Sequence, residues 1–408
     1  MGYLKEFASH WPNLLGAAMG LAFGTALNHY MMNLFGPALI AEFGWSKSQF
    51  ALVGMIGLVG MVCMPVAGWL TDRFGPRLAA SIGFTAVPVA YLLMSMLSGN
   101  IWEFYALQAV KASFGILTAT MVFTRAIIER FDRARGLAMA VMLCGPPLVG
   151  SALAPIIGGI IEAEGWRTAY RVMAVLSAAG GFGAVLLIGR GGGARPAPRS
   201  KDTQLTWAKF REMCGSRTFV LLIVGMFLVN LPQVLVSSQL SVMLMENGAT
   251  AQFAAALLSV YGMSVVFGRF VSGLALDRIS PHIVAIFSLG LPALGYAGLA
   301  SDFDARWVLA GAIALVGLAQ GAETDVAAIL TSRRFELTHF SFVYAMLMTS
   351  QGLASALGAG LLSFTLREGG DFNLFLIICA LATLLGAAFF FLTGNTPKVR
   401  ERPIGEPA

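Results

Sequence analysis

A single arginine lies in the middle of a long apolar stretch, YGMSVVFGRFVSGLALDR, which runs from Tyr261 to Arg278. Arg269 lies eight residues before Asp277, which marks a water-facing end, and this separation is about 12 Å along a helix. A hydrocarbon core is about 30 Å thick, so the guanidinium is predicted near its centre, where an unpaired charge costs at least about 3 kcal/mol. A guanidinium can form two parallel hydrogen bonds to a carboxylate. We therefore expect Arg269 to face an anion; the alternative is a structural arginine that holds neighbouring helices together.

Lys111 is a second basic residue inside an apolar stretch. It lies nine residues after Trp102, which is predicted near the outer surface, so its depth is about 13 Å. A desolvated lysine shifts its pKa readily, which makes Lys111 a candidate for a second substrate-binding cation or for part of a proton path. A structural hydrogen-bond donor to neighbouring helices is the alternative.

Three acidic or imidazole side chains within predicted spans are candidates for carrying a proton. Glu323 and Asp325 are the only close acidic pair in such a span, and two residues apart on a helix they point about 200° apart. We expect one to face a cavity while the other pairs with a basic loop residue; Glu323 is our preferred proton carrier, with a structural salt bridge as the alternative. His29 is of the residue type that titrates near neutrality, although a packing role is the alternative.

Neutral polar side chains gather in two of the predicted spans. The first span carries Asn28, His29, Tyr30 and Asn33. The seventh carries a polar stripe of Asn230, Gln233, Ser237, Ser238 and Gln239. The predicted substrate-binding residues are Arg269, Lys111, Asn28, His29, Asn230, Gln233, Tyr261 and Gln351.

The composition excludes most soluble and enzymatic classes. Of 408 residues, 57% are hydrophobic and 12% are charged, and the mean hydropathy of +0.76 is typical of polytopic membrane proteins. The net charge of +6 comes largely from short loops between apolar segments, so we expect no nucleic-acid partner. The four cysteines show no metal or disulfide spacing, and neither a phosphate loop nor a catalytic triad is present. We expect neither an enzyme nor a cofactor or metal site.

About twelve apolar segments, each of about 20 residues or more, are long enough to cross a membrane as helices. The predicted fold class is therefore an all-α polytopic membrane protein. The N-terminal segment is predicted to be a retained first helix, because it has no signal-peptide cleavage site. The predicted spans are roughly 12–40, 50–70, 78–97, 101–125, 136–161, 168–188, 219–245, 253–276, 282–300, 307–330, 340–366 and 372–392.

A Gly-, Pro- and Arg-rich stretch between the sixth and seventh spans is the only long polar segment inside the chain. It predicts two bundles of six helices. We expect an N-terminal bundle in 1–188, a cytoplasmic linker in 189–217, a C-terminal bundle in 218–394 and a cytoplasmic tail in 395–408.

Basic residues collect in alternate loops, whereas the other loops carry mainly acidic residues. The positive-inside rule then predicts that both termini lie in the cytoplasm. We expect an integral protein of a bacterial-type inner membrane, and a monomer.

The two halves repeat a short element. A Gly-x-x-x-Asp-Arg sequence begins at Gly68 after the second span and again at Gly273 after the eighth. The fourth span contains Lys111-x-x-x-Gly115, and the fifth contains a glycine-proline motif over 145–159. With these motifs, the chain resembles the major facilitator superfamily along its whole length. That resemblance implies twelve helices in two bundles and transport by alternating access.

Within that superfamily, the chain is similar to the monocarboxylate transporter and oxalate/formate antiporter group, in its bacterial branch. The residues that carry this similarity are Phe43-Gly44-Trp45-Ser46, Arg135-Gly136-Leu137-Ala138, Gly165-Trp166-Arg167-Thr168-Ala169-Tyr170, Gly268-Arg269 with Gly273, and Gly321-Ala322-Glu323-Thr324-Asp325.

Two positions depart from that group. Val265 stands where mammalian monocarboxylate carriers have an aspartate, one turn before the eighth-helix arginine. Gln351 stands where oxalate exchangers have an eleventh-helix lysine. With one fixed cation fewer, we expect a monoanion as substrate in preference to a dianion.

The resemblance also implies gating or scaffold roles for charged residues at the cytoplasmic ends of the helices. Arg125 and Glu129 are four residues apart, so a salt bridge on one helical face is expected. The candidate gating and scaffold residues are Asp72, Arg73, Asp277, Arg278, Arg125 and Glu129.

The function predicted from these residues and this resemblance is secondary active transport of a small or aromatic monocarboxylate. Its partners would be the organic anion, protons in symport and the lipid bilayer. The alternatives are organic-anion exchange of the oxalate/formate type, efflux of drugs or metabolites, and a carrier-like nutrient sensor.

Overall fold

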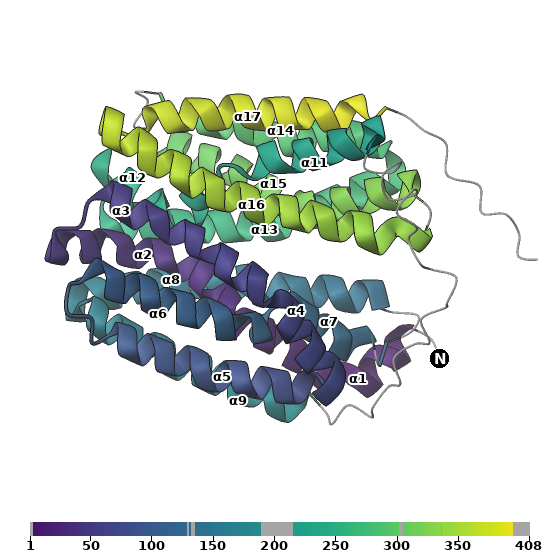
Figure 1. The fold of residues 1–408 in the computed structure, drawn as a ribbon, viewed down its shortest axis with the longest axis horizontal. Helices are drawn as coiled ribbons and strands as arrows, with labels where there is room; N and C mark the ends of the chain where they lie inside the picture. Colours follow the sequence, from purple (N-terminus) through teal and green to yellow (C-terminus); the bar gives the residue numbers. More distant parts are fainter. Residues whose placement is uncertain are drawn as a thin grey trace, which may run out of the picture. The chain divides into compact units, whose positions relative to one another are not determined.

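A computed structural model describes residues 3–128, 130–131, 135–188, 215–301, 305–335 and 337–394, and every regular element in these residues is helical (Figure 1). Apolar segments form helices in lipid because a helix satisfies its own backbone hydrogen bonds. The helices are α1 (Tyr3–Phe23), α2 (Thr25–Phe43), α3 (Lys47–Ala51), η1 (Leu52–Ile56), α4 (Gly57–Phe74), α5 (Pro76–Met94), α6 (Ile101–Gly115), η2 (Ile116–Thr118), α7 (Thr120–Ile128), α8 (Arg135–Glu164), α9 (Trp166–Leu187), α11 (Arg217–Asn230), η4 (Leu235–Gln239), α12 (Leu240–Glu246), α13 (Ala251–Arg278), α14 (Pro281–Leu299), α15 (Arg306–Arg334), α16 (Leu337–Gly369) and α17 (Asn373–Leu392).

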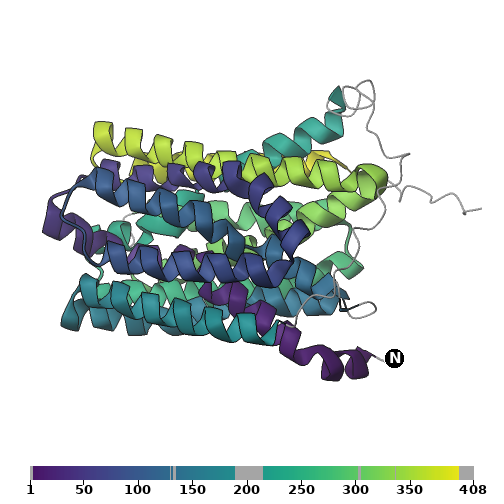
Figure 2. The same cartoon turned by 60° about the horizontal axis from the view of Figure 1, so that its bottom comes forward.

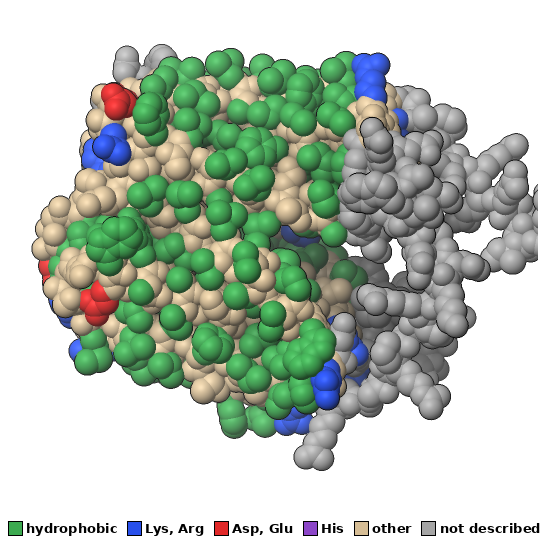
Figure 3. Space-filling view, in the orientation of Figure 1, with side chains coloured by type: hydrophobic (Ala, Val, Ile, Leu, Met, Phe, Trp, Pro, Cys, Tyr) green, Lys and Arg blue, Asp and Glu red, His purple; other side chains and the backbone are tan. Residues whose placement is uncertain are grey.

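Within these described residues, eleven helical segments are long and apolar enough to cross a membrane. Their outer faces are apolar: Val175, Phe182 and Leu186 on α9, and Leu381 and Leu384 on α17, are each more than half exposed. In Figure 3, apolar side chains cover most of the described surface in view. Contact of such a surface with lipid tails costs little free energy, whereas its exposure to water is unfavourable. The predicted all-α polytopic class is confirmed.

The first predicted span is not one continuous helix. It is divided at Gly24 into α1 and α2. The backbone N–H of Thr25 donates to the Thr118 hydroxyl at 2.9 Å. A Cβ on Gly24 would lie 2.4 Å from the same hydroxyl oxygen, so only glycine leaves room for this approach. The predicted span over 12–40 is therefore built from two helices, and a side chain from η2 supplies a backbone hydrogen bond at the break.

Two further predicted spans are interrupted near their middles. The fourth is built from α6, η2 and α7, with an extended backbone at Ala119. The seventh is built from α11, the π-helix η4 and α12. Interrupted helices in membrane transporters expose backbone groups and small side chains to a cavity. The polar residues beside these interruptions are therefore candidates for lining a cavity.

The chain divides into two compact units. Unit 1 contains Met1–Pro198, Pro232–Val266 and Ser355–Phe375, and unit 2 contains the remaining segments, which are Arg199–Leu231, Phe267–Ala354 and Leu376–Ala408. This division passes through the continuous helices α13 and α16. The boundaries of the two six-helix bundles stay a prediction.

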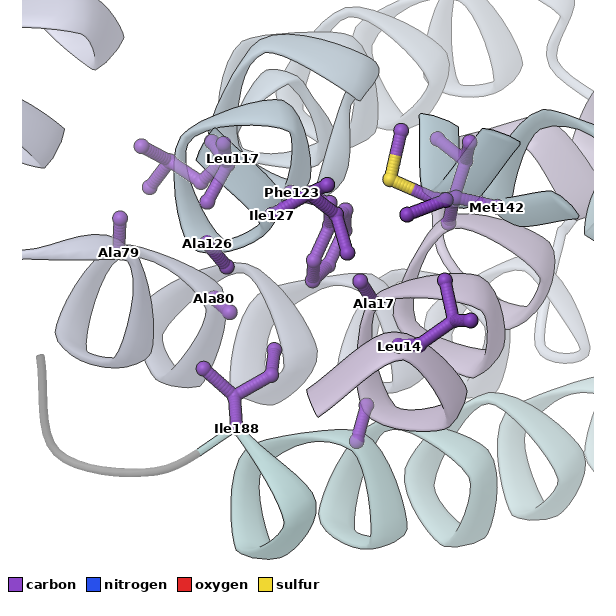
Figure 4. Packing of buried hydrophobic residues seen from close by; sticks show 14 of the residues in the cluster. Leu14, Ala17, Ala79, Ala80, Leu117, Phe123, Ala126, Ile127, Met142 and Ile188 are labelled. Carbon is purple, nitrogen blue, oxygen red and sulfur yellow. The ribbon is translucent and has the colours of Figure 1, made fainter. Parts of the chain in front are cut away.

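In unit 1, α1 packs against α8 and α9, and α5 packs against α9 (Figure 1; Figure 2). The apolar core between these helices alternates small and large side chains, as Ala17 and Phe123 show in Figure 4. A Cβ on Gly20 would lie 2.3 Å from the Phe123 ring. Small residues thus allow the helix backbones to approach closely, as is usual in membrane bundles.

In unit 2, α14 lies along α15, and a second apolar core contains Phe219, Met226 and Phe390. A close backbone approach joins α13 to α15. A Cβ on Gly268 would lie 2.1 Å from the Leu318 carbonyl oxygen. Because this contact brings the two helices together next to Arg269, it positions the arginine beside α15.

Candidate functional site

An ion pair in unit 2 joins the eighth and tenth predicted spans. Arg269 on α13 has its Nη1 atom 3.6 Å from Oδ1 of Asp325 on α15. The arginine side chain is 13% exposed, whereas that of Asp325 is 33% exposed. The Nε atom of Arg269 is buried and has no hydrogen-bond partner in the described chain. A guanidinium has five donors, so this arginine retains capacity for another anion.

Asp325 also supplies a carboxylate partner for Arg269 that the sequence did not predict. Among the described residues this pair lies between two long apolar helices, and the expected pairing of one acid with a basic loop residue stays a prediction. Val265 stands one turn before Arg269, so α13 offers no carboxylate at that position. The carboxylate beside the arginine therefore comes from α15 instead of α13.

Glu323 lies in a separate environment, surrounded by carboxamides. It is 3% exposed, and Asn230 of α11 and Gln351 of α16 both donate to its Oε1 atom, Gln351 at 3.1 Å. Gln320, three residues earlier on α15, donates to Oε2 at 3.3 Å. Amide N–H donors favour the ionised carboxylate without neutralising its charge. A proton is the simplest way to neutralise Glu323.

Glu323 and Asp325 therefore point to different partners, as expected for two residues separated by two positions on a helix. Three of the predicted substrate-binding residues, Arg269, Asn230 and Gln351, lie in unit 2 with these two acids. Gln320 was not predicted. Its spacing of three residues from Glu323 on one helical face is the signal that could have identified it.

Unit 1 contains a cavity of about 180 Å³ with a mixed polar and apolar wall. Both polar stripes that the sequence singled out reach it, one from α2 and the other from η4. Gln108, three residues before Lys111 on α6, joins them and was missed; the same three-residue spacing was its signal. The cavity is lined by Thr25, Asn28, His29, Met32, Val53, Gly54, Ile56, Gly57, Gln108, Ser237 and Ser238.

Lys111 stands behind this cavity and fixes the orientation of Asn28. Lys111 is 3% exposed; its Nζ donates to Asn28 Oδ1 at 2.5 Å and lies 5.1 Å from the centre of the Tyr91 ring. Lysine has donors and no acceptor, so the oxygen of the amide must face it. The Nδ2 group of Asn28 is therefore the end available to a ligand in the cavity.

The remaining predicted binding residues also belong to unit 1 but make different contacts. His29 stacks edge-on against Tyr30, with ring centres 5.2 Å apart. Tyr261 on α13 is 1% exposed, and its ring centre is 6.1 Å from that of Tyr30. Gln233 lies between α11 and η4, is half-buried, and does not line the cavity.

The candidate gating residues are described only in part. Arg73 lies over the Trp69 ring at 5.4 Å and over the Phe74 ring at 5.6 Å. Arg125 is half-buried in α7, and Arg278 is exposed at the end of α13. Glu129 and the side chains of Asp72 and Asp277 lie outside the described residues, so the expected salt bridges stay predictions.

No group of three or more His, Cys, Asp or Glu side chains that could hold a metal is present in the part of the chain that the structure describes.

A comparison with protein-family models decides the family. The model of the Major Facilitator Superfamily matches residues 19–300 and 222–408. The chain belongs to the major facilitator superfamily. It is an integral membrane transporter and not an enzyme.

Curated relatives of this transporter include both efflux proteins and monocarboxylate transporters. An agnestins efflux protein, AgnL12, of Paecilomyces divaricatus is 26% identical over 382 residues, which cover 91% of this chain and 82% of that protein. Monocarboxylate transporter 13 of Rattus norvegicus is 24% identical over 376 residues, which cover 90% of this chain and 85% of that protein.

Solved structures of superfamily members share the fold. The nucleoside transporter NupG has a TM-score of 0.76 at 14% identity, covering 93% of this chain and 98% of that one. A D-xylose-proton symporter has a TM-score of 0.70 at 15% identity, covering 96% of this chain and 98% of that one. At these identities the likeness establishes the fold alone.

Proposed function

We propose that this carrier moves a small or aromatic monocarboxylate together with a proton, by alternating access. The observation that carries the proposal is Arg269, a buried guanidinium whose Nε lacks a hydrogen-bond partner and whose ion pair with Asp325 is 3.6 Å long. A charge-assisted pair at its best is shorter, at about 2.7–2.9 Å. A substrate carboxylate can therefore compete for this arginine.

The two acids divide the remaining work in this proposal. A substrate anion on Arg269 displaces Asp325, and a proton on Asp325 makes that exchange easier because the carboxylate loses its charge. Glu323 is our preferred carrier of the transported proton, because its hydrogen-bond donors among the described residues are carboxamides, which carry no charge. Neutralising it lowers the electrostatic cost of moving the loaded carrier through its reorientation. His29 is the remaining candidate.

Unit 1, taken by itself, contains a second candidate for ligand recognition. Because Lys111 holds the oxygen of Asn28, the Asn28 Nδ2 group is a donor that suits an oxygen of a ligand in this cavity. We assign Lys111 to orienting Asn28, and Asn28 to direct contact with that ligand. The apolar part of the wall, which includes Val53 and Ile56, suits a short aliphatic or aromatic body.

The test is uptake of a panel of labelled monocarboxylates into proteoliposomes, with and without an inward proton gradient. Arg269→Ala should reduce uptake by roughly 100-fold, since it removes one partner of a buried charge-assisted pair. The matched control is Arg167→Ala. This residue is 42% exposed in its side chain and pairs with Glu42 at 2.5 Å, so its loss removes the same charge away from the site.

Gradient-driven uptake that is lost in Arg269→Ala and kept in Arg167→Ala supports both the anion site and symport. Uptake that ignores the proton gradient but requires carboxylate on the opposite side supports organic-anion exchange instead. Normal uptake of every transported acid by Arg269→Ala contradicts the proposed role of this arginine.

Efflux of an acidic metabolite is the second candidate, because two of the curated relatives are named as efflux proteins. The same site would serve it. Proteoliposomes loaded with substrate and given an external acid pulse distinguish the two: an exporter that works by proton exchange would lose its content faster, whereas a symporter would retain it.

A further inference from the structure

The side chain of Asn33 lies between two backbone groups of the seventh predicted span and forms hydrogen bonds with both. This side chain on α2 is completely buried, at 0% exposure. Its Nδ2 donates to the Val236 carbonyl oxygen at 2.6 Å, and its Oδ1 accepts from the Leu240 N–H at 2.8 Å. A carbonyl can only accept and an N–H can only donate, so the orientation of this amide is fixed. All three residues belong to unit 1.

The two backbone groups that Asn33 contacts are the two ends of one α-helical hydrogen bond. In a regular helix, Leu240 N–H would donate directly to Val236 C=O, four residues earlier. Here the carboxamide serves both groups, and the chain forms the π-helix η4 over Leu235–Gln239. A side chain inserted into the helical ladder is a known cause of such an irregularity.

This π-helix also shapes the candidate cavity. Ser237 and Ser238 lie within η4 and line the cavity wall. A π-turn accommodates one more residue than the corresponding α-turn, so closing it to an α-helix would rotate the following residues by about 100°. Asn33 therefore influences where these serines point, although it does not line the cavity itself.

Other polar contacts in unit 1 link the first-half helices to the same segments of the second half. Ser48 and Ser363 share a hydrogen bond of 2.8 Å between their hydroxyls. Ser259 donates to the Ser151 carbonyl at 2.6 Å, and Lys47 forms an ion pair with Glu246. These contacts lie toward the predicted outer end of the helices. In a carrier that alternates access, contacts between the two halves at the outer end must break in one of the two states.

The part of unit 1 that contains these contacts also contains unsatisfied polar groups. Gln239, the last residue of η4, is 0% exposed, and neither its Nε2 nor its Oε1 has a hydrogen-bond partner in the described chain. A buried polar atom without a partner destabilises the state that buries it, and water would satisfy it once the end opened. Asn33 and Gln239 thus act in opposite directions on the same short helix.

We propose that Asn33 is a positioning residue that latches the predicted outer end of the carrier, and that the buried amide of Gln239 opposes this latch. Asn33 holds η4 in its π-helical form and keeps the two serines in the cavity wall. Gln239 prevents the closed state from becoming too stable to reopen. This inference rests on the proposed alternating-access transport, but not on the identity of the substrate.

The experiment measures the opening of this end without any substrate. Spin labels are attached at Met96 and Leu374, both exposed and both in unit 1, in a cysteine-free chain, and their distance distribution is recorded by pulsed electron resonance. Asn33→Leu keeps the approximate size and should raise the open-to-closed ratio by about tenfold, as expected for losing two hydrogen bonds. Adding Gln239→Met to this variant should lower the ratio again.

One control variant and one alternative test variant accompany this experiment. Ser177→Ala removes a partly buried hydrogen bond of 2.9 Å to the Phe23 carbonyl, within the first-half helices, and should leave the distances unchanged. If Asn33→Leu does not yield folded protein, Asn33→Asp carries the test: it can still accept from Leu240 but cannot donate to Val236, so an intermediate shift is expected.

Unchanged distances in a folded Asn33 variant, or greater opening on adding Gln239→Met, would overturn the latch. Failure of the proposed substrate is a separate result, because it appears in the uptake assay and leaves the distance measurement intact. For any substrate that the protein transports, Asn33→Leu should alter the KM and the maximal rate of uptake together, whereas Ser177→Ala should alter neither.

Discussion

At the scale of single residues, Asp325 controls how available Arg269 is to a substrate. Arg269 Nη1 and Asp325 Oδ1 are 3.6 Å apart, and among the described residues Asp325 is the acidic partner of the arginine. A competitor for a binding group weakens ligand affinity in proportion to how strongly it binds that group. The state of Asp325 should therefore appear in the substrate affinity.

Asp325→Asn should tighten substrate binding severalfold at neutral pH and make it less dependent on pH. In the wild type, protonating Asp325 removes its charge, so affinity should rise as the pH falls; asparagine imitates the protonated acid at every pH. Equilibrium binding between pH 5 and pH 8 checks this. Arg167→Ala is the control. If the dependence of substrate affinity on pH is unchanged in Asp325→Asn, a different titratable group causes it.

Glu323→Gln should separate proton coupling from substrate movement. Glutamine fills the same space and can still accept from Asn230 and Gln351, but it cannot carry a proton. We expect exchange of labelled for unlabelled substrate to continue, and accumulation driven by a proton gradient to be lost by at least about tenfold. If the variant still accumulates substrate, the proton passes through Asp325 or His29 instead.

At the scale of helices, close backbone approach sets the geometry around the arginine. Gly268 lies against the Leu318 carbonyl of α15, whereas a Cβ on Gly273 of the same helix would meet nothing within 4 Å. The two glycines are five residues apart, so the second serves as an internal control for the first. Only one of them is required for packing.

Gly268→Ala should destabilise the carrier by roughly 2 kcal/mol or more, because the backbone carbonyl cannot move away without displacing α15. Gly273→Ala should be neutral or slightly stabilising, since alanine favours a helix by about 1 kcal/mol where space allows. Thermal unfolding in detergent compares them. Equal stability of the two variants would contradict the close contact.

The helices also show which features a sequence pattern can predict. Apolar length predicted where helices run, because hydrocarbon requires the backbone to bond within its own segment. It did not predict the division at Gly24 or the π-helix at η4. Each of those depends on a side chain from a distant segment, Thr118 in one case and Asn33 in the other.

At the scale of the whole molecule, the distribution of basic residues predicts the direction of insertion. Both termini are expected in the cytoplasm. Alkaline phosphatase fused after residue 408 should be inactive, and a green fluorescent protein at the same site should fluoresce. Phosphatase inserted in the loop after Met96 should be active. The reverse pattern at both sites would invert the proposed orientation, and with it the end that Asn33 latches.

The sequence alone determined the membrane class, the approximate limits of the apolar spans, and a short set of polar candidates, since a charged or amide side chain in an apolar span is costly and therefore informative. Only the tertiary structure decided which of them meet. Arg269 pairs with Asp325, Glu323 lies among three carboxamides, and Lys111 orients Asn28. Helical periodicity fixes the face on which a side chain lies, but the partner on the next helix depends on the packing of small residues such as Gly268, which no pattern along the chain records.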